Sequence, residues 1–368
     1  MTLHSRNRFL AVISLLLLTI FGETACYSQD VPKFKFDVRK RSKGGAILEC
    51  LGWEPKMFFE QPDMIAACQA VQDKSMEGLK QMQANGFDWN AQGKGGTTIL
   101  FWALLSEDFP IYEQLLIWGA DPNIKITIAD NVRLGAFKEY VGNGDTVFAI
   151  TSRLIYRQQW FETTLTHGGD PHFVENRFGW SLIQELLHSQ GQLTDDGLRP
   201  LQMLIDAGAD LNHLDKDGWP AVIAAFVGNQ PQATVLLIEQ GASVDCYDKN
   251  DWQLIHHMAG IDILRVERHA ADPKAREDWN ESHYKKAWDQ TVKLLAERGH
   301  SLVDAKIDYH RRFETVDGIP YMKWRRMMRQ DKDPCVSKSK KSATSPAGEV
   351  KTAPEPKLIS PPKIQQAN

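Results

Sequence analysis

Leu201–Phe226 reads LQMLIDAGADLNHLDKDGWPAVIAAF, and Thr234–Ala259 repeats this pattern as TVLLIEQGASVDCYDKNDWQLIHHMA. An earlier and shorter copy, at Tyr112–Asn123, reads YEQLLIWGADPN. Each copy ends a helix-like run with large aliphatic residues and continues with a glycine and a short polar turn. Self-similarity of this kind is the sequence signature of a repeat architecture. The chain is therefore predicted to be a solenoid of stacked helices, a class of protein that mostly binds other macromolecules.

The glycine that closes each copy recurs along the chain. It is found at Gly86, Gly119, Gly168, Gly208, Gly241 and Gly299. The intervals are 33, 49, 40, 33 and 58 residues, so the three longer ones equal the 33-residue unit plus insertions of 16, 7 and 25 residues. A glycine is expected here because a left-handed helix C-cap disfavours a Cβ atom. The Asp and Asn residues that follow favour a tight turn.

These units resemble the ankyrin-repeat family, whose unit opens with D-x-x-G-x-T-P-L-H-x-A and closes with L-L-x-x-G-A-D-x-N. The openings that carry the resemblance are Gly96–Ala103, Gly144–Phe148, Gly179–Ile183, Asp215–Pro220 and Asp248–His256. The resemblance implies an all-α, ankyrin-like helical repeat solenoid with loop insertions. It also implies that Thr98, Thr146 and His256, at the family's Thr and His positions, tie neighbouring loops together.

Degenerate units are expected to flank five clear ones. Met64–Asn90 resembles a first unit and Asp317–Met322 could open a last half-unit, so the repeat domain is assigned to residues 64–330. Residues 29–63 are then an N-terminal lead-in segment. On a helix, the basic stretch Lys323–Arg329 would place Trp and Met on one face and Arg on another. It is predicted to be a terminal cap with a polar outer surface.

The first 28 residues have the composition of an export signal. Two arginines precede the 12-residue apolar run Leu10–Phe21, which spans only about 18 Å as a helix and is short for a bilayer. Cleavage after Ser28 would leave an exported chain without a membrane span, in the periplasm or outside the cell. Two alternatives are an uncleaved anchor and lipid attachment at Cys26, which follows Thr24-Ala25.

The last segment, residues 331–368, is predicted to be a disordered tail rich in Lys, Pro and Ser. Residues 337–368 hold six lysines, five prolines, two glutamates and no aromatic residue. Such a composition cannot bury enough apolar surface to offset the entropy of ordering. The tail could be a spacer, could contact an anionic surface, or could simply be solvated.

The charge and the cysteine content argue against nucleic-acid-binding, disulfide-stabilised and zinc-binding classes of protein. The net charge of −4 gives no overall field that would capture nucleic acid, so no nucleic-acid partner is expected. The cysteines left after signal cleavage are Cys50, Cys68, Cys246 and Cys335. Their number and spacing indicate neither a disulfide framework nor a zinc site. Cys50 and Cys68 could pair, or they could remain buried thiols.

No motif for catalysis is found, and no catalytic residue, metal ligand or cofactor is assigned. His256 and His257 are adjacent on an expected helix and point about 100° apart, so they would not chelate one ion. The insertions Lys125–Gly142 and Ile263–Ala287 are where an enzyme site could be built. A helix over Asp278–His283 would gather acidic residues on one side, which could bind a cation or form a solvated face.

A tryptophan follows the opening residue in three consecutive units. The resemblance implies that this position, the two residues before the opening residue, and the residue after the family's histidine (here Trp102, Glu185 or His257) face the concave surface. The candidate partner-binding residues are Trp102, Arg177, Phe178, Trp180, Lys216, Trp219, Lys249, Trp252 and His257. Aromatic residues in register would form an interface. Alternatively, the insertions cover this face and the rings belong to the core.

The leading hypothesis is a monomeric, exported repeat protein that binds an unknown protein partner through a concave aromatic surface, without catalysis. One alternative is an envelope-tethered lipoprotein scaffold. The other is an enzyme whose site is built from the insertions. The repeat pattern also predicts that Leu236 and Leu237 seal the core between units.

Overall fold

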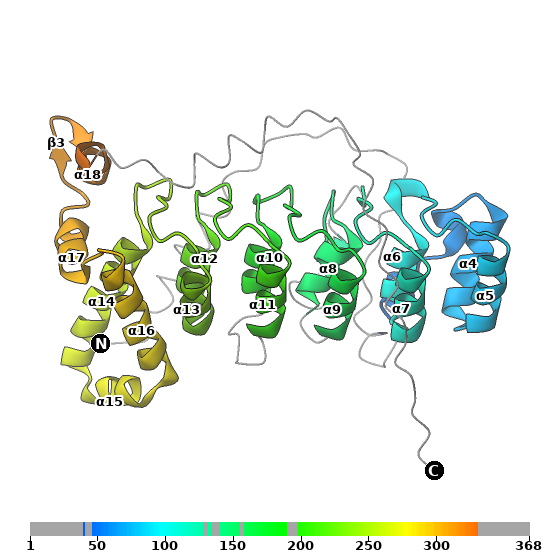
Figure 1. Ribbon diagram of the computed structural model, residues 1–368, viewed down its shortest axis with the longest axis horizontal. Coiled ribbons are helices and arrows are strands. Elements are labelled where there is room, and N and C mark those ends of the chain that lie inside the picture. The colour runs from blue at the N-terminus through cyan, green and yellow to red at the C-terminus, as the bar shows by residue number, and fades with distance from the viewer. Residues whose placement is uncertain are drawn as a thin grey trace, which may run out of the picture.

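The computed structural model describes residues 40, 46–127, 132–133, 140–154, 158–189 and 198–329. Helices make up most of this part of the chain, and Figure 1 shows them standing side by side in one long row. The protein is an all-α, ankyrin-like helical repeat solenoid with loop insertions. The predicted export signal and tail, residues 1–28 and 331–368, lie outside the described residues.

Six helix pairs form the row within the described residues. They are α4 (Pro62–Gln72) and α5 (Met76–Ala84), α6 (Ile99–Ser106) and α7 (Phe109–Ile117), α8 (Val147–Arg153) and α9 (Gln158–Thr166), α10 (Leu182–Ser189) and α11 (Leu198–Asp206), α12 (Ala221–Val227) and α13 (Pro231–Glu239), and α14 (Leu254–Ala271) and α16 (His283–Glu297). Before them lie α3 (Ile47–Leu51) and the 3₁₀ turn η1 (Pro55–Met57); a second turn, η2 (Lys94–Gly96), precedes α6. A short strand pair, β1 (Val132–Arg133) with β2 (Tyr140–Val141), lies between α7 and α8.

The helices are arranged in two columns. The first helices of the pairs contact one another in order from α4 through α6, α8, α10 and α12 to α14. The second helices α7, α9, α11, α13 and α16 form the other column. Each pair therefore buries its apolar face against its neighbours, which is the stabilising principle of a solenoid.

Helix ends follow from local sequence. The hydroxyl of Thr98 accepts a hydrogen bond from the Phe101 N–H at 3.2 Å, and that of Thr146 accepts one from Ala149 at 3.1 Å, so both threonines are N-caps. The six closing glycines all have left-handed φ angles, between 76° and 97°. The prediction that these glycines end the second helices is thereby confirmed.

The closing turns also join neighbouring units. The Asn90 side chain donates to the Gly119 carbonyl at 3.1 Å and accepts from the Asp121 N–H at 2.7 Å. Equivalent inter-unit bonds are made by Asn123 and Asn212. The asparagine of each G-A-D-x-N sequence thus bridges to the next unit, in addition to shaping its own turn.

Two apolar clusters fill the interior, and they meet at α8. The N-terminal cluster extends from Ile47 to Trp160 and the C-terminal cluster from Phe148 to Ala305. The described part of the lead-in segment belongs to the first cluster, since α3 packs on α6. Between α12 and α16, Leu237 is fully buried and Leu236 is half-buried.

The cysteines of the N-terminal part belong to this interior. Cys50 and Cys68 are buried thiols and are not joined to each other. Of the two possibilities left open by the sequence, the structure therefore shows buried thiols. Burial raises the pKa of the Cys68 thiol above its usual range, which makes it a weak nucleophile.

The insertion predicted at Ile263–Ala287 is helical. The first helix of the last pair, α14, has 18 residues where α12 has seven, and its second half projects beyond the row toward α15 (Pro273–Glu281). The expected helix over Asp278–His283 is wrong. Helix α15 ends at Glu281, and the Ser282 hydroxyl caps the new helix α16 by accepting the Lys285 N–H.

A cap follows the last pair, consisting of α17 (Leu302–His310), a hairpin of β3 (Thr315–Val316) and β4 (Ile319–Pro320), and α18 (Tyr321–Arg329). The prediction of a polar outer face on α18 is wrong. Arg325 is buried and forms an ion pair with Asp308, with Nε 2.5 Å from Oδ2, and Met327 and Met328 are exposed instead. Tertiary pairing with α17 therefore overrides the simple amphipathic pattern.

Candidate functional site

Three successive loops project beyond the helix pairs at the upper edge of Figure 1, and each is closed by a carboxylate. We call them fingers: Glu175–Trp180, Asp215–Trp219 and Asp248–Trp252. In each finger the N–H of the acidic residue donates to the carbonyl of the tryptophan, at 2.9, 3.1 and 2.8 Å respectively. The same acidic side chain accepts the tryptophan N–H, at 3.2, 2.8 and 3.0 Å. The three tryptophans therefore occupy equivalent, fixed positions.

The first finger is one residue longer than the other two. The acidic residue stands five positions before Trp180 but four before Trp219 and Trp252, and Glu175 replaces aspartate there. The longer side chain spans the extra residue, and it also accepts the Arg177 and Phe178 N–H groups. The fingers are thus built by one device with a compensating change in side-chain length.

Burial and hydrogen bonding act differently on these carboxylates. Burial outweighs two backbone hydrogen bonds and raises the pKa of Asp215. Burial would also raise the pKa of Asp248, but hydrogen bonds from the His257 side chain, at 3.1 Å, and from the Trp252 N–H outweigh it and lower that pKa. His257 therefore adds a charge-assisted contact to the third finger.

Aromatic rings line the bases of the fingers. Trp180 stacks between Phe178, with ring centroids 4.4 Å apart, and His188, at 4.0 Å. Trp219 and Trp252 both meet His257 edge to face, at 6.1 and 5.3 Å. These rings are half-buried. We call Phe178, Trp180, His188, Trp219, Trp252 and His257 the aromatic finger surface.

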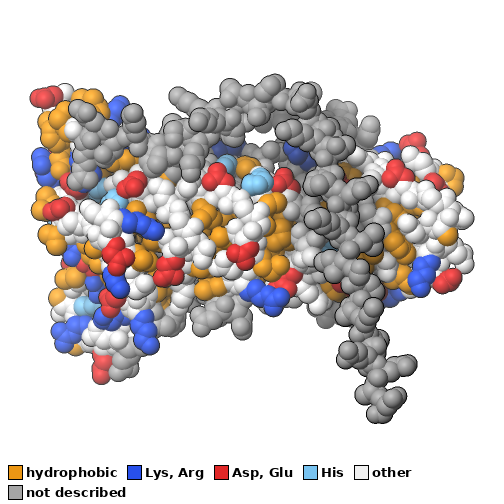
Figure 2. Space-filling model, viewed as in Figure 1, with side chains coloured by type: hydrophobic (Ala, Val, Ile, Leu, Met, Phe, Trp, Pro, Cys, Tyr) orange, Lys and Arg blue, Asp and Glu red, His pale blue; other side chains and the backbone are white. Residues whose placement is uncertain are grey.

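The predicted basic residues border this surface. Arg177, Lys216 and Lys249 are exposed, and the Arg177 guanidinium lies 4.7 Å from the centre of the Phe178 ring. Lys216 Nζ donates to the carbonyls of Asn176 and Arg177, while Lys249 forms an ion pair with Asp217. The two lysines hold adjacent fingers together and still present positive charge to solvent. Figure 2 shows charged and histidine side chains along this edge of the molecule.

Trp102 is not part of the surface, and its assignment as a partner-binding residue is corrected. Its side chain is 0% exposed, with the rings of Phe58 and Phe59 at 5.9 and 6.2 Å. The segment before α4 covers the face that later units leave open. Glu185, at the same repeat position, is also buried, so of these three residues only His257 reaches the surface.

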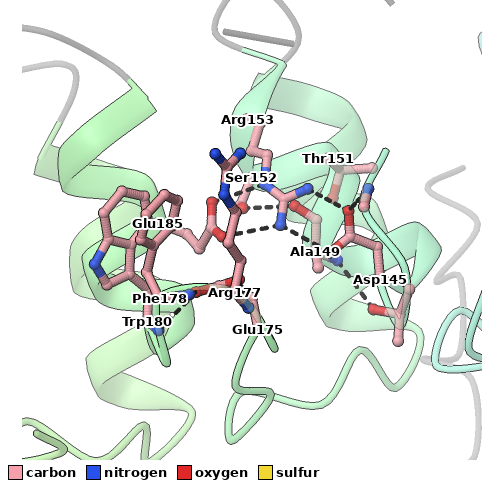
Figure 3. A network of polar contacts seen from close by, with 12 residues as sticks. Asp145, Ala149, Thr151, Ser152, Arg153, Glu175, Arg177, Phe178, Trp180 and Glu185 are labelled. Carbon is pink, nitrogen blue, oxygen red and sulfur yellow. Dashed lines mark hydrogen bonds and ion pairs between the residues drawn. The ribbon is translucent and has the colours of Figure 1, made fainter. Parts of the chain in front are cut away.

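Glu185 belongs to a buried ionic triad below the first finger. Arg153 Nε and Nη2 donate to Glu185 at 2.7 and 2.9 Å, and Nη1 and Nη2 donate to Asp145 at 2.5 and 3.0 Å. Figure 3 shows the guanidinium between the two carboxylates, with Glu175 and its finger close by. The triad joins α8, α10 and the loop before α8.

The charges of the triad control one another's ionisation. Burial disfavours the charged form of Arg153, but the charges of Glu185 and Asp145 outweigh burial and raise its pKa above the usual range. Burial raises the pKa of Glu185, and the guanidinium offsets that rise only in part. The arrangement is a structural charge cluster, since all three side chains are enclosed.

The sequence analysis did not assign the triad, His188 or the finger carboxylates to the site. Two of the finger carboxylates could have been found from a repeated spacing, because D-K-D-G-W and D-K-N-D-W both place the acidic residue four positions before the tryptophan. No sequence pattern indicated the triad, since Asp145 and Glu185 lie 8 and 32 residues from Arg153.

His256 is buried, but the hydrogen bond between neighbouring units that the resemblance implied is not found among the described residues, where its Nε2 has no hydrogen-bond partner. Its Nδ1 accepts the Gln253 N–H at 3.1 Å, and its Nε2 lies 3.6 Å from Asp308 on α17. Burial lowers the pKa of His256, so the neutral ring is favoured. The turn aspartates behave as expected, since Asp170 and Asp210 each accept an N–H two residues further on.

Within the described residues, no group of three or more His, Cys, Asp or Glu side chains could hold a metal ion. Of the helices that the structure describes, none combines the length and hydrophobicity that a membrane span requires. The insertion Lys125–Gly142 is described only in part, and the side chains of Glu281 and His283 lie outside the described set.

No protein-family model matches the chain, and no curated protein matches it. Solved structures do share features of its fold. An ankyrin repeat domain from Acinetobacter baumannii AYE is 20% identical, with a TM-score of 0.43, covering 64% of this chain and 98% of that one. The ankyrin repeat domain of Bcl-3, a member of the IkappaB family, is 17% identical, with a TM-score of 0.41, covering 54% and 81%.

A third similar structure is a complex. It joins a predatory endopeptidase from Bdellovibrio bacteriovorus to an immunity protein, and the matched chain is 18% identical, with a TM-score of 0.40, covering 61% of this chain and 97% of that one. At identities this low, each likeness concerns the arrangement of helices alone.

Proposed function

We propose that this protein is a non-catalytic interaction module that binds a protein partner through the aromatic finger surface. The observation that supports this most directly is the repetition of one arrangement in three successive fingers, a buried carboxylate that accepts the backbone N–H of a half-buried tryptophan. Large aromatic side chains are common hot spots of protein interfaces. Side chains fixed before binding lose little entropy when a partner arrives.

The border of the surface indicates the character of the partner. Arg177, Lys216 and Lys249 are exposed beside the rings, so the partner is expected to place acidic residues around an apolar contact. Charges at such a rim act mainly on the association rate, and this contribution falls as salt increases.

We also propose that the module acts after export, in the periplasm or outside the cell, because residues 1–28 have the composition of an export signal. Lipid attachment at Cys26 would instead hold it at the envelope. Partitioning of the mature protein into detergent separates these two cases.

The test of the binding role is capture of partners from the exported fraction of the native source. The full chain is compared with a variant carrying Trp180→Ala, Trp219→Ala and Trp252→Ala. The matched control is Trp118→Ala, a half-buried tryptophan in a closing turn whose ring stacks on Trp89 at 5.2 Å.

A protein captured by the full chain and by the control, and lost by the triple variant, is the expected result. Circular dichroism confirms that the variants keep their helices. A captured protein that is retained equally by the triple variant would show that the finger surface is not the interface.

A further inference from the structure

The helical insertion forms a pocket that lies outside the finger surface. It has a volume of about 460 Å³ and lies between α14, α15 and the start of α16. Its α14 side is lined by Ile261, Leu264, Arg265, Arg268 and His269, which share one helix face because they are three or four residues apart. A volume of this size suits one large side chain and its neighbours, or a small ligand.

The walls of the pocket combine apolar and cationic groups. Leu264 is 55% exposed although it is a large aliphatic residue, and Trp279 on α15 and Tyr284 on α16 line the same pocket. Arg268 is exposed, and its side chain has no ion-pair partner within the part of the chain that the structure describes. One carboxylate, Asp278, lies on the α15 wall.

Arg265 lines the pocket and is held by two aromatic rings and an ion pair. Its guanidinium lies 4.8 Å from the centre of the Trp279 ring and 5.4 Å from that of Trp288, and it forms an ion pair with Asp262. Its Nε atom is buried and finds no acceptor among the described residues. The pocket therefore has a fixed cation between two aromatic rings.

We propose that this pocket binds an acidic segment of a protein partner, which inserts one aromatic or aliphatic side chain against Leu264 and Trp279 and places flanking carboxylates at Arg268 and His269. The charge of the walls selects this occupant. The chain's own residues 337–368 carry six lysines against two glutamates and have the wrong sign for the same position. The inference does not depend on the finger surface, which lies on a different part of the solenoid.

The experiment uses the full chain and a fluorescein-labelled peptide, Glu-Glu-Phe-Glu-Glu, with fluorescence anisotropy as the readout. Two variants alter the pocket, Leu264→Ala and Arg268→Glu. Each has a matched control outside the lining: Val266→Ala, at 53% exposed on the same helix, and Arg276→Glu on α15, also exposed. All four positions face solvent, so the variants are expected to fold.

The peptide is expected to bind the unaltered chain, and binding is expected to weaken about tenfold or more in each pocket variant and less than about twofold in each control. Binding should also weaken as salt increases. A peptide with lysine in place of glutamate should not bind.

Three results would overturn the proposal. The first is no binding at millimolar peptide. The second is binding that is equal in pocket and control variants. The third is binding of anionic phospholipid vesicles, with the same dependence on Leu264 and Arg268, in place of the peptide. Because the probe is a synthetic peptide, a negative result for the pocket does not bear on the proposed finger interface. A negative result for the finger interface does not bear on this test of the pocket.

Discussion

Arg153 joins two units of the solenoid through a single side chain. Its planar guanidinium satisfies Asp145 and Glu185 at once, with two hydrogen bonds to each. An apolar replacement for the whole triad could be equally stable, but removing one member leaves buried charges without a partner. Replacing the arginine should therefore lower the free energy of unfolding more than replacing either carboxylate.

Replacing Arg153 with leucine is expected to reduce the free energy of unfolding by about 3–5 kcal/mol, because two buried carboxylates lose their counter-charge. The measurement is a urea titration at neutral pH. The matched control is Arg199→Leu, which breaks an ion pair with Glu162 at the surface and should cost less than about 1 kcal/mol. Equal losses in the two variants would contradict the structural role assigned to the triad.

His256 makes stability depend on pH near neutrality. Burial lowers its pKa in the folded state, so the unfolded chain binds the proton more readily. Its contribution to stability is therefore present above the unfolded pKa of about 6.5 and is lost as the pH falls through the folded pKa. The aspartates with lowered pKa, Asp248 and Asp308 among them, lose their contributions in a separate window, below about pH 4.

Unfolding free energies measured by urea in steps from pH 7.5 to pH 5 should therefore fall, with a slope of at most about 1.4 kcal/mol per pH unit from this group. The His256→Gln variant should be less stable at pH 7.5 and should show a clearly smaller slope. An unchanged slope in the variant would mean that another group titrates in this range.

At the scale of single elements, local rules account for what the sequence could predict. The closing glycines and the turn aspartates depend on backbone geometry within a few residues, and both were predicted. Thr98 and Thr146 were expected to tie neighbouring loops together, and the hydrogen bonds that the structure shows for their hydroxyls cap their own helices instead. The wrong predictions depend on partners that are distant in sequence. Trp102 is covered by residues 58 and 59, and Arg325 is drawn inward by Asp308.

The candidate surface was likewise predictable only in part. The register of Trp180, Trp219 and Trp252 was visible as a repeat, and the structure places them equivalently. Whether a ring is exposed depends on what packs over it, so the sequence left interface and core both open, and the rings are half-buried. The pocket of the insertion could not be predicted, because it needs three helices whose boundaries the sequence did not indicate.

Gly218 tests the element that links two fingers. Its φ angle is 78°, and a Cβ atom built there would lie 3.0 Å from the Lys249 backbone nitrogen. Gly218→Ala is expected to cost more than Gly241→Ala, which has a φ of 94° but open space around it. The second variant carries only the conformational penalty, about 1 kcal/mol, and the difference measures the contact between fingers. Equal losses of unfolding free energy in the two variants, measured by urea titration, would show that the contact between the fingers does not contribute to stability.

At the scale of the whole molecule, stability is a sum over neighbouring units, since the extensive contacts of each helix pair, among the described residues, are with adjacent elements. The interior is correspondingly divided into two apolar clusters that meet at α8. Damage to one cluster should therefore stay largely within it. The helices that follow the three fingers, α10, α12 and α14, contribute to the C-terminal cluster, and α14 also carries one wall of the pocket, so the stability of that part matters most for binding.

Leu237→Ala tests this regional behaviour. Leu237 is fully buried in the C-terminal cluster, and its truncation should reduce the free energy of unfolding by about 2–5 kcal/mol, whereas half-buried Leu236→Ala should cost less. Hydrogen exchange should accelerate in α12, α13 and α14 and change little in α4, α6 and α7, because the latter helices pack in the other cluster. Uniform acceleration along the chain would mean that the two clusters unfold as one unit. A loss below about 1 kcal/mol at both leucines would contradict the packing of α13 between its neighbours.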